Sequence, residues 1–189
     1  MHEAQKIFTS KVKQKFFDYF ENKVVLDVGS YDINGNNKYL FESCKYTGVD
    51  IIDGENVDIV SKGHEYNAAD KSFDTIISTE CFEHDMYYDK TLKNIIRMLK
   101  PGGLFVFSCG GPGRLEHGTL RTTPQDSGVT LVNKTDDPDW EIWQNYYKNL
   151  GESHIREVLD IESIFKHHQF YYAPPPIADL YFWGIKNGK

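Results

Sequence analysis

The stretch VVLDVGSYDINGN, residues 24–36, decides the fold of this chain, because an apolar run ends there in a polar loop. The run at 24–28 is short and shows no clear alternation, which is typical of a parallel strand buried on both faces. Gly29 and Ser30 open the loop that follows. Such a loop presents backbone N–H groups to a ligand, and a glycine lets the ligand approach the main chain. The stretch therefore predicts a ligand site at the carboxyl end of a parallel strand.

The same loop lacks the glycine pattern of a dinucleotide site. The fingerprint G-x-G-x-x-G needs a second glycine where Tyr31 stands, and the next glycine is Gly35. Asp32 adds a negative charge that would repel a pyrophosphate. The loop thus favours a ligand with an ammonium group or a neutral sugar. Asp50, at the end of the next apolar run, supports an adenosine, because a carboxylate there can accept hydrogen bonds from both ribose hydroxyls.

Short apolar runs alternate with helical patterns along most of the chain. Strands are expected at 24–28, 46–52, 57–60, 73–78 and 104–109, with a terminal hairpin at 170–186. Helices are expected within 1–22, at 36–43, from near Asp85 to the KPGG sequence at 100–103, and at 153–168 with a break near Asp160. This order predicts an α/β fold with a doubly wound, mostly parallel, seven-stranded Rossmann-like sheet, a C-terminal antiparallel hairpin and helices on both faces. Residues 1–189 would form a single domain, with 110–150 as a substrate lid or insertion.

Composition excludes several classes of protein. The chain has 189 residues, of which 40% are hydrophobic, and this suits one domain with a proper core. A formal net charge of -7 argues against a nucleic acid partner, which requires a concentrated basic face. The three cysteines are widely spaced without a C-x-x-C pair, so no metal site and no disulfide framework is predicted. No apolar run suits a membrane span or a signal peptide, and we expect a cytoplasmic protein without a membrane partner.

Four motifs follow one another along the first half of the chain. They are VLDVGS at 25–30, GVDI at 48–51, SFDTIISTECFEH at 72–84 and LKPGGLFVFS at 99–108. In this order they resemble the class I S-adenosylmethionine-dependent methyltransferases, specifically the small-molecule type that consists of the methyltransferase core. The resemblance covers about residues 20–110, and LYFWGIK at 180–186 matches the last antiparallel strand of that family. It implies S-adenosylmethionine as the cofactor and a small-molecule acceptor, with the hydroxyl of a sugar or metabolite considered first.

The resemblance also implies which residues bind the cofactor. The methionine moiety would be bound by Asp27, Gly29, Ser30, Tyr31 and Asp32, and the ribose by Asp50. The adenine would lie beside Ile51, Gly63 and His64. Thr79 and Glu80 would face the centre of the cofactor. Lys62 and Gly63 stand where the family often has an acid near the adenine, so backbone groups would make those contacts.

Methyl transfer is an in-line displacement at the methyl carbon, so alignment and the exclusion of water are the main tasks. A hydroxyl acceptor also benefits from a general base, for which His84 is the first candidate and His117 the second, because imidazole titrates near neutrality. Alternatively, His84 only forms a hydrogen bond or caps its helix. Residues 110–147 are expected to form the acceptor wall, or else a surface excursion whose tryptophans pack into the core. The side chains expected to contact an acceptor there are Arg114, His117, Arg121, Trp140, Trp143 and Tyr146.

Three other functions compete with this interpretation. A nicotinamide-dependent oxidoreductase shares the strand, loop and ribose acid but expects G-x-G-x-x-G. A non-catalytic module would keep the fold and bind the cofactor without turnover. An amino-methylating nucleic-acid enzyme would carry a D-P-P-Y type of motif after the fourth strand, where this chain has STEC at 78–81.

Overall fold

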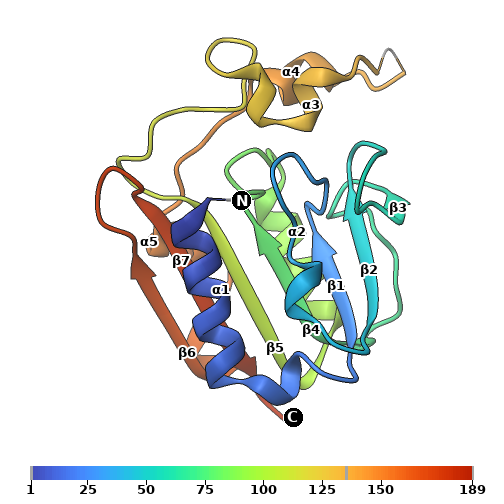
Figure 1. Ribbon diagram of the computed structural model, residues 1–189, viewed down its shortest axis with the longest axis vertical. Coiled ribbons are helices and arrows are strands. Elements are labelled where there is room, and N and C mark those ends of the chain that lie inside the picture. Colours follow the sequence, from blue (N-terminus) through green and yellow to red (C-terminus); the bar gives the residue numbers. More distant parts are fainter. Residues whose placement is uncertain (1, 135, 189) are drawn as a thin grey trace.

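The computed structural model of the protein describes residues 2–134 and 136–188. Its strands form one sheet in the order β3-β2-β1-β4-β5-β7-β6 (Figure 1). The strands are β1 (Val24–Val28), β2 (Lys45–Asp50), β3 (Ile59–Val60), β4 (Phe73–Thr79), β5 (Leu99–Gly110), β6 (Phe165–Tyr172) and β7 (Asp179–Lys186). Strands β1 to β5 pair with one another in parallel, and β7 runs antiparallel to β5 and β6. The predicted seven-stranded, mostly parallel sheet with an antiparallel C-terminal hairpin is confirmed.

Helices cover both faces of this sheet (Figure 1). They are α1 (Glu3–Lys15), α2 (Tyr88–Met98), α3 (Gly128–Leu131), α4 (Trp140–Asn145), α5 (Glu152–Val158) and α6 (Ile161–Ile164), with short 3-10 helices η1 (Phe17–Tyr19), η2 (Lys38–Leu40) and η3 (Pro124–Asp126). None of the described helices combines the length and apolar character that a membrane crossing requires.

The pleat of β5 shows how the two faces are filled. Leu104 and Val106 belong to the hydrophobic cluster under α1, together with Phe8. Phe105 and Phe107 point to the opposite face and belong to the cluster that includes α2, α5 and α6. Successive side chains of a strand alternate between faces, so an uninterrupted apolar run is what a strand covered on both sides requires.

The region 153–168, which the sequence predicts as helical, is helical only in part. Helices α5 and α6 do break at Asp160, whose carboxylate accepts a hydrogen bond from the Ser163 N–H at 3.2 Å. The prediction of a helix through residue 168 was wrong, because β6 begins at Phe165. The Phe165 ring packs 5.3 Å from the Phe182 ring, and the backbone from 165 onward pairs with β7. Strand pairing and this aromatic contact outweigh the local helical pattern, and His167 lies on the edge strand.

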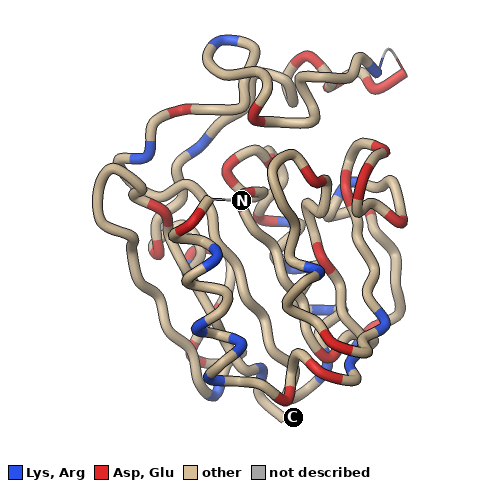
Figure 2. The backbone as a smooth tube through the Cα atoms, in the orientation of Figure 1, with Lys and Arg blue, Asp and Glu red and all other residues tan. Residues whose placement is uncertain are grey.

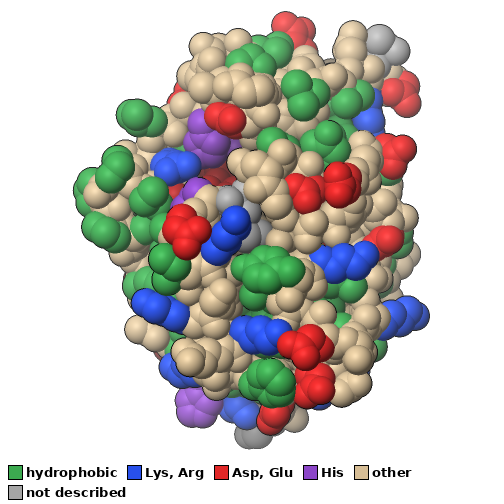
Figure 3. All heavy atoms as spheres, in the orientation of Figure 1, with side chains coloured by type: hydrophobic (Ala, Val, Ile, Leu, Met, Phe, Trp, Pro, Cys, Tyr) green, Lys and Arg blue, Asp and Glu red, His purple; other side chains and the backbone are tan. Residues whose placement is uncertain are grey.

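The carboxyl ends of the parallel strands meet at one edge of the sheet, beside the amino terminus of α1 (Figure 1). Strand β7 starts at the same edge, because Asp179 is paired with Gly110 at the end of β5. Residues 111–134 and 136–149 run above this edge and carry η3, α3 and α4 (Figure 1). Acidic residues are frequent in the loops there, whereas Lys and Arg gather along α1 and at the opposite end of the sheet (Figure 2). On the surface, histidine and acidic side chains lie close together where the upper segment meets the sheet (Figure 3).

Candidate functional site

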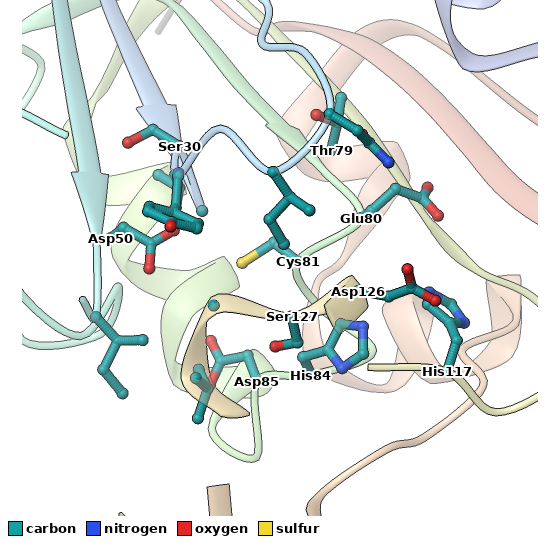
Figure 4. Close-up of a pocket in the computed structure, with 18 of the residues that line it drawn as sticks. Ser30, Asp50, Thr79, Glu80, Cys81, His84, Asp85, His117, Asp126 and Ser127 are labelled. Atoms are coloured by element: carbon teal, nitrogen blue, oxygen red, sulfur yellow. The ribbon is translucent and has the colours of Figure 1, made fainter. Parts of the chain in front are cut away.

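A cavity of about 570 Å³ opens at this edge, between the loops after β1, β2 and β4 and the segment above them (Figure 4). Most predicted site residues line it. They are Asp27, Gly29, Ser30, Tyr31, Asp50, Ile51, Gly63, Thr79, Glu80, His84 and His117. Asp32 and His64 are not among the lining residues. Asp32 accepts hydrogen bonds from the Gly35 N–H at 2.5 Å and from Asn36 Nδ2 at 2.7 Å, while the His64 ring packs 4.6 Å from that of Tyr87.

Asp27 presents a buried carboxyl group to the cavity. The Tyr46 hydroxyl donates a hydrogen bond to its Oδ2, and Asn37 Nδ2 lies 3.5 Å from the same oxygen. Its Oδ1 is buried and has no hydrogen-bond partner among the described residues. Burial raises the pKa of Asp27 to about 7, although the two hydrogen-bond donors act to lower it. A cationic group that enters the cavity could pair with the free oxygen.

Asp50 ends β2 with its carboxylate held by the backbone. Its Oδ2 accepts from the Tyr31 N–H at 3.0 Å and its Oδ1 from the Ile52 N–H at 3.2 Å. Burial raises the pKa of this carboxyl group as well. Gly29 has a φ of 79°, and a Cβ at this position would lie 2.5 Å from Cys81 Sγ. Only glycine lets the β1 loop approach the β4 loop so closely.

An apolar cluster closes the cavity over the β1 and β2 loops. It joins Ile52, with Tyr31 and Ile51 beside it, to Val129, Trp140 and Trp143 of the upper segment. A Cβ at Gly128 would lie 2.2 Å from Ile52 Cδ1, so this contact depends on a glycine. Both tryptophans are buried, and Trp143 also lines the cavity. The segment is thus packed onto the sheet's loops, and its tryptophans form the contact between the two.

Not every residue expected on the acceptor wall reaches the cavity. Arg114 and His117 line it, whereas Arg121, Trp140 and Tyr146 are not among the lining residues. Arg121 forms an ion pair with Glu116 at 2.8 Å.

His84 and His117 lie together at the end of the cavity away from Asp50 (Figure 4). Their ring centroids are 5.1 Å apart, and the Tyr147 ring lies 5.4 Å from His84 and 5.1 Å from His117. Burial lowers the pKa of His84 to about 3 and also lowers that of His117. The two rings are therefore neutral at pH 7, each with a nitrogen lone pair available.

Glu80 brings a second set of polar side chains to the same end. It adopts a φ of 52°, which is uncommon for a residue with a side chain. Its carboxylate accepts a hydrogen bond from Ser108 Oγ at 2.8 Å and lies 3.9 Å from His2 Nε2, which is itself 2.8 Å from Asp179. Burial and the charge of Asp179 raise the pKa of Glu80 to about 7.

Sequence reasoning missed several residues of this site. Glu83 lies inside the quoted ECFEH motif, is fully buried and accepts a hydrogen bond from the Gly110 N–H at 2.9 Å. Its position next to His84 was a usable signal. His2 and Asp179 gave no such signal, because they come from the two ends of the chain. Only the tertiary fold brings His2 to the cavity lining and places Asp179 2.8 Å from it.

Solved structures with the same fold include several methyltransferases. The 1,6-didemethyltoxoflavin-N1-methyltransferase of Burkholderia thailandensis, bound to 1,6-didemethyltoxoflavin and S-adenosylhomocysteine, is 20% identical with a TM-score of 0.62, over 97% of this chain and 78% of that one. A methyltransferase of Archaeoglobus fulgidus is 16% identical with a TM-score of 0.58, over 94% and 93%. Phosphoethanolamine N-methyltransferase 2 of Haemonchus contortus is 16% identical with a TM-score of 0.61, over 94% of this chain and 52% of that one, so this chain spans about half of its length. A search of curated proteins found no match.

The family comparison covers most of the chain. Residues 2–171 match the family described as Methyltransferase domain. This range contains β1 to β5, every predicted cofactor-binding residue and both predicted catalytic histidines. The chain belongs to this methyltransferase-domain family, which confirms the prediction of a class I S-adenosylmethionine-dependent methyltransferase.

Proposed function

We propose that the enzyme transfers the methyl group of S-adenosylmethionine to a hydroxyl group of a small, neutral, sugar-like acceptor. The main observation behind this proposal is that the basic side chains in the cavity are already paired with other groups of the protein. Lys62 and Arg114 are the only Lys and Arg among the described lining residues. Lys62 forms an ion pair with Asp137 at 2.8 Å, and Arg114 donates to the Ile177 carbonyl at 3.0 Å and lies 3.7 Å from Asp179. A phosphorylated or carboxylated acceptor would therefore find no unpaired cation.

The cofactor would occupy the half of the cavity between Asp27 and Asp50. The free Oδ1 of Asp27 suits the ammonium group of the methionine moiety. Asp50 suits the ribose hydroxyls, and Ile51 lies where it can pack on the adenine. Ser30, Gly63 and the other predicted cofactor residues that line the cavity support this placement. Asp32 and His64 would act only by supporting the loops around it, since they lie outside the lining.

The acceptor would then occupy the end with the two histidines. Besides His84 and His117, the side chains there are Glu80, Asp126 and Ser127, all of which can accept hydrogen bonds from hydroxyl groups (Figure 4). In the reaction, the acceptor oxygen forms a bond to the methyl carbon while the carbon–sulfur bond breaks. The sulfur keeps the electron pair, and the product is S-adenosylhomocysteine. The proton passes from the acceptor oxygen to solvent or to a nearby carboxylate such as that of Glu80. We assign His84 and His117 to the polarisation of that oxygen.

A panel of matched acceptors tests this proposal. The purified enzyme is supplied with S-adenosylmethionine carrying a labelled methyl group and with neutral sugars and glycosides, each paired with its phosphate ester. We expect transfer to members of the neutral set and a rate at least about tenfold lower for the esters, because an unpaired buried charge is costly. Preference for the esters contradicts the neutral-acceptor proposal. Saturable cofactor binding without transfer to any acceptor would favour the non-catalytic alternative.

A further inference from the structure

Three side chains at the acceptor end have the composition of a metal site. Glu83 and His84 follow β4, and His117 belongs to the segment after β5. Each offers one ligand atom, and these atoms all lie within 4.8 Å of one another. Ligand atoms at about 2.0–2.2 Å from a common ion are roughly 3–4 Å apart, so small side-chain movements would bring all three into coordination.

Two of these side chains have a buried atom without a partner. Glu83 is fully buried and uses Oε1 to accept from the Gly110 N–H, but its Oε2 has no hydrogen-bond partner among the described residues. The same is true of His84 Nδ1. A buried polar atom left unpaired is unfavourable, and two unpaired atoms in one cluster require an explanation. A bound cation would satisfy both.

The surroundings of the cluster favour a cation. The carboxyl groups of Glu80 and Asp179 are close enough to interact electrostatically with that of Glu83. Among the described residues, His2 and Arg114 act against this negative charge at Glu80, and each of them is engaged with Asp179. The left-handed backbone of Glu80 is a local strain of the kind that is found at ligand sites.

We propose that Glu83, His84 and His117 bind a divalent first-row transition-metal ion at the acceptor end of the cavity. Two neutral imidazoles and one carboxylate form a donor set that suits Zn²⁺, Mn²⁺ or Fe²⁺ better than Ca²⁺ or Mg²⁺, which prefer oxygen ligands. Three protein ligands leave at least one position of the ion open toward the cavity.

The open position gives the ion a role in methyl transfer, and this part of the inference rests on the proposed function. A hydroxyl oxygen bound to the ion becomes more acidic and is fixed in place. Its proton leaves to solvent or to a neighbouring carboxylate such as that of Glu80. The resulting alkoxide attacks the methyl carbon while sulfur departs with the electron pair. His84 and His117 would then act as ligands that polarise the acceptor through the ion.

The second cluster of potential ligands in the described residues is a weaker candidate and provides a control. His2, Glu80 and Asp179 also place their ligand atoms within 4.8 Å of one another. Asp179 Oδ1 is also a buried atom without a hydrogen-bond partner among the described residues. However, His2 already contacts Asp179 Oδ2 at 2.8 Å, and Glu80 already accepts from Ser108. His2→Ala removes a ligand of that cluster alone, and His167→Ala removes an exposed histidine far from either cluster.

The test is ion binding by the chelator-treated, full-length enzyme. We expect isothermal titration with Zn²⁺ and with Mn²⁺ to give one site per chain, and Co²⁺ to produce a visible absorption band. His117→Ala and the double variant His84→Ala/His117→Ala should weaken binding at least about 100-fold, whereas His2→Ala and His167→Ala should bind as the wild type does. Circular dichroism and the affinity for S-adenosylhomocysteine show whether each variant is folded.

Each outcome of this test is decisive. No stoichiometric binding by the wild type, or wild-type affinity in a folded double variant, overturns the metal site. Loss of binding in His2→Ala with retention in the double variant moves the ion to the other cluster and also overturns the proposal. If the ion binds as expected but the chelated enzyme methylates a neutral acceptor at full rate, the role of the ion is overturned while the proposed function stands.

Discussion

At the scale of the residue, Asp27 is the acid whose protonation should control cofactor binding. Its pKa of about 7 leaves it largely protonated below neutral pH in the free enzyme. An ammonium group bound at Oδ1 would lower that pKa, so affinity is greatest above pH 7 and is lost as the pH falls through it. We expect the affinity for S-adenosylhomocysteine to fall by up to about tenfold per pH unit between pH 7 and pH 5.5. Calorimetric titration across pH 5.5–8.5 measures this.

The matched control is Asp27→Asn, which keeps the shape of the side chain and cannot ionise. Its affinity should be weaker at pH 8 and change little with pH. A wild-type profile that is flat, or that coincides with the profile of this variant, would show that Asp27 does not pair with the cofactor.

The sequence predicts a cavity residue best when that residue lies directly at the end of a strand. It was predictable that Asp27 and Asp50 would line one cavity, because parallel strands end at one edge and acids at those ends must converge. Asp32 was expected beside the cofactor, but it stabilises its own turn instead through Gly35 and Asn36. Only the tertiary fold decides between a turn and a ligand for such a residue. His2 escaped notice for a related reason, since it reaches the site through the packing of α1.

At the scale of the element, buried strands and the amphipathic helix α2 were predictable because their patterns reflect burial on the sheet. The last part of the region 153–168 was not, because a short apolar pattern fits a helix or a strand equally well and long-range pairing decides. The short η2 and β3 show the same limit. Their few residues are held by neighbouring loops, and local sequence signals carry little information about such contacts.

The segment at 111–149 should behave as a lid over the bound cofactor. Its helices α3 and α4 have only four and six residues, which is too short for independent stability, and its apolar contact with the sheet's loops is small. We expect its amides to exchange with solvent faster than those of α2 in the free enzyme. Bound S-adenosylhomocysteine should slow this exchange, because it would rest on Ile51 and the loops that the lid contacts. Hydrogen-exchange mass spectrometry compares the two states.

A glycine variant provides the control for the lid. Gly128→Ala places a Cβ against Ile52 and Tyr31 and should weaken the slowing, whereas Gly188→Ala, where nothing lies within 4 Å, should not change it. Equally slow exchange with and without ligand would mean that the segment is a fixed part of the domain.

At the scale of the whole molecule, the cavity joins the loops after β1, β2, β4 and β5 to the start of α1, so a ligand there should stabilise the entire domain. A ligand at 100 times its dissociation constant contributes about 2.7 kcal/mol to the free energy of unfolding. For a chain of this size, that corresponds to a rise in melting temperature of about 5–10 °C. We expect S-adenosylhomocysteine to produce this rise in thermal unfolding.

NAD should leave the melting temperature unchanged. A pyrophosphate is normally bound at the amino terminus of an α-helix that follows β1, whereas here the loop contains Asp32 and leads only to the three-residue η2. Asp50→Asn tests whether the rise comes from the predicted site. The substitution weakens hydrogen bonds between the ribose and the carboxylate, and hydrogen bonds to a charged group contribute about 1.5–3 kcal/mol. At the same concentration of S-adenosylhomocysteine, the rise in melting temperature should therefore be less than half that of the wild type. A rise with NAD equal to that with S-adenosylhomocysteine would mean that the β1 loop tolerates phosphate and that its acid does not select the ligand.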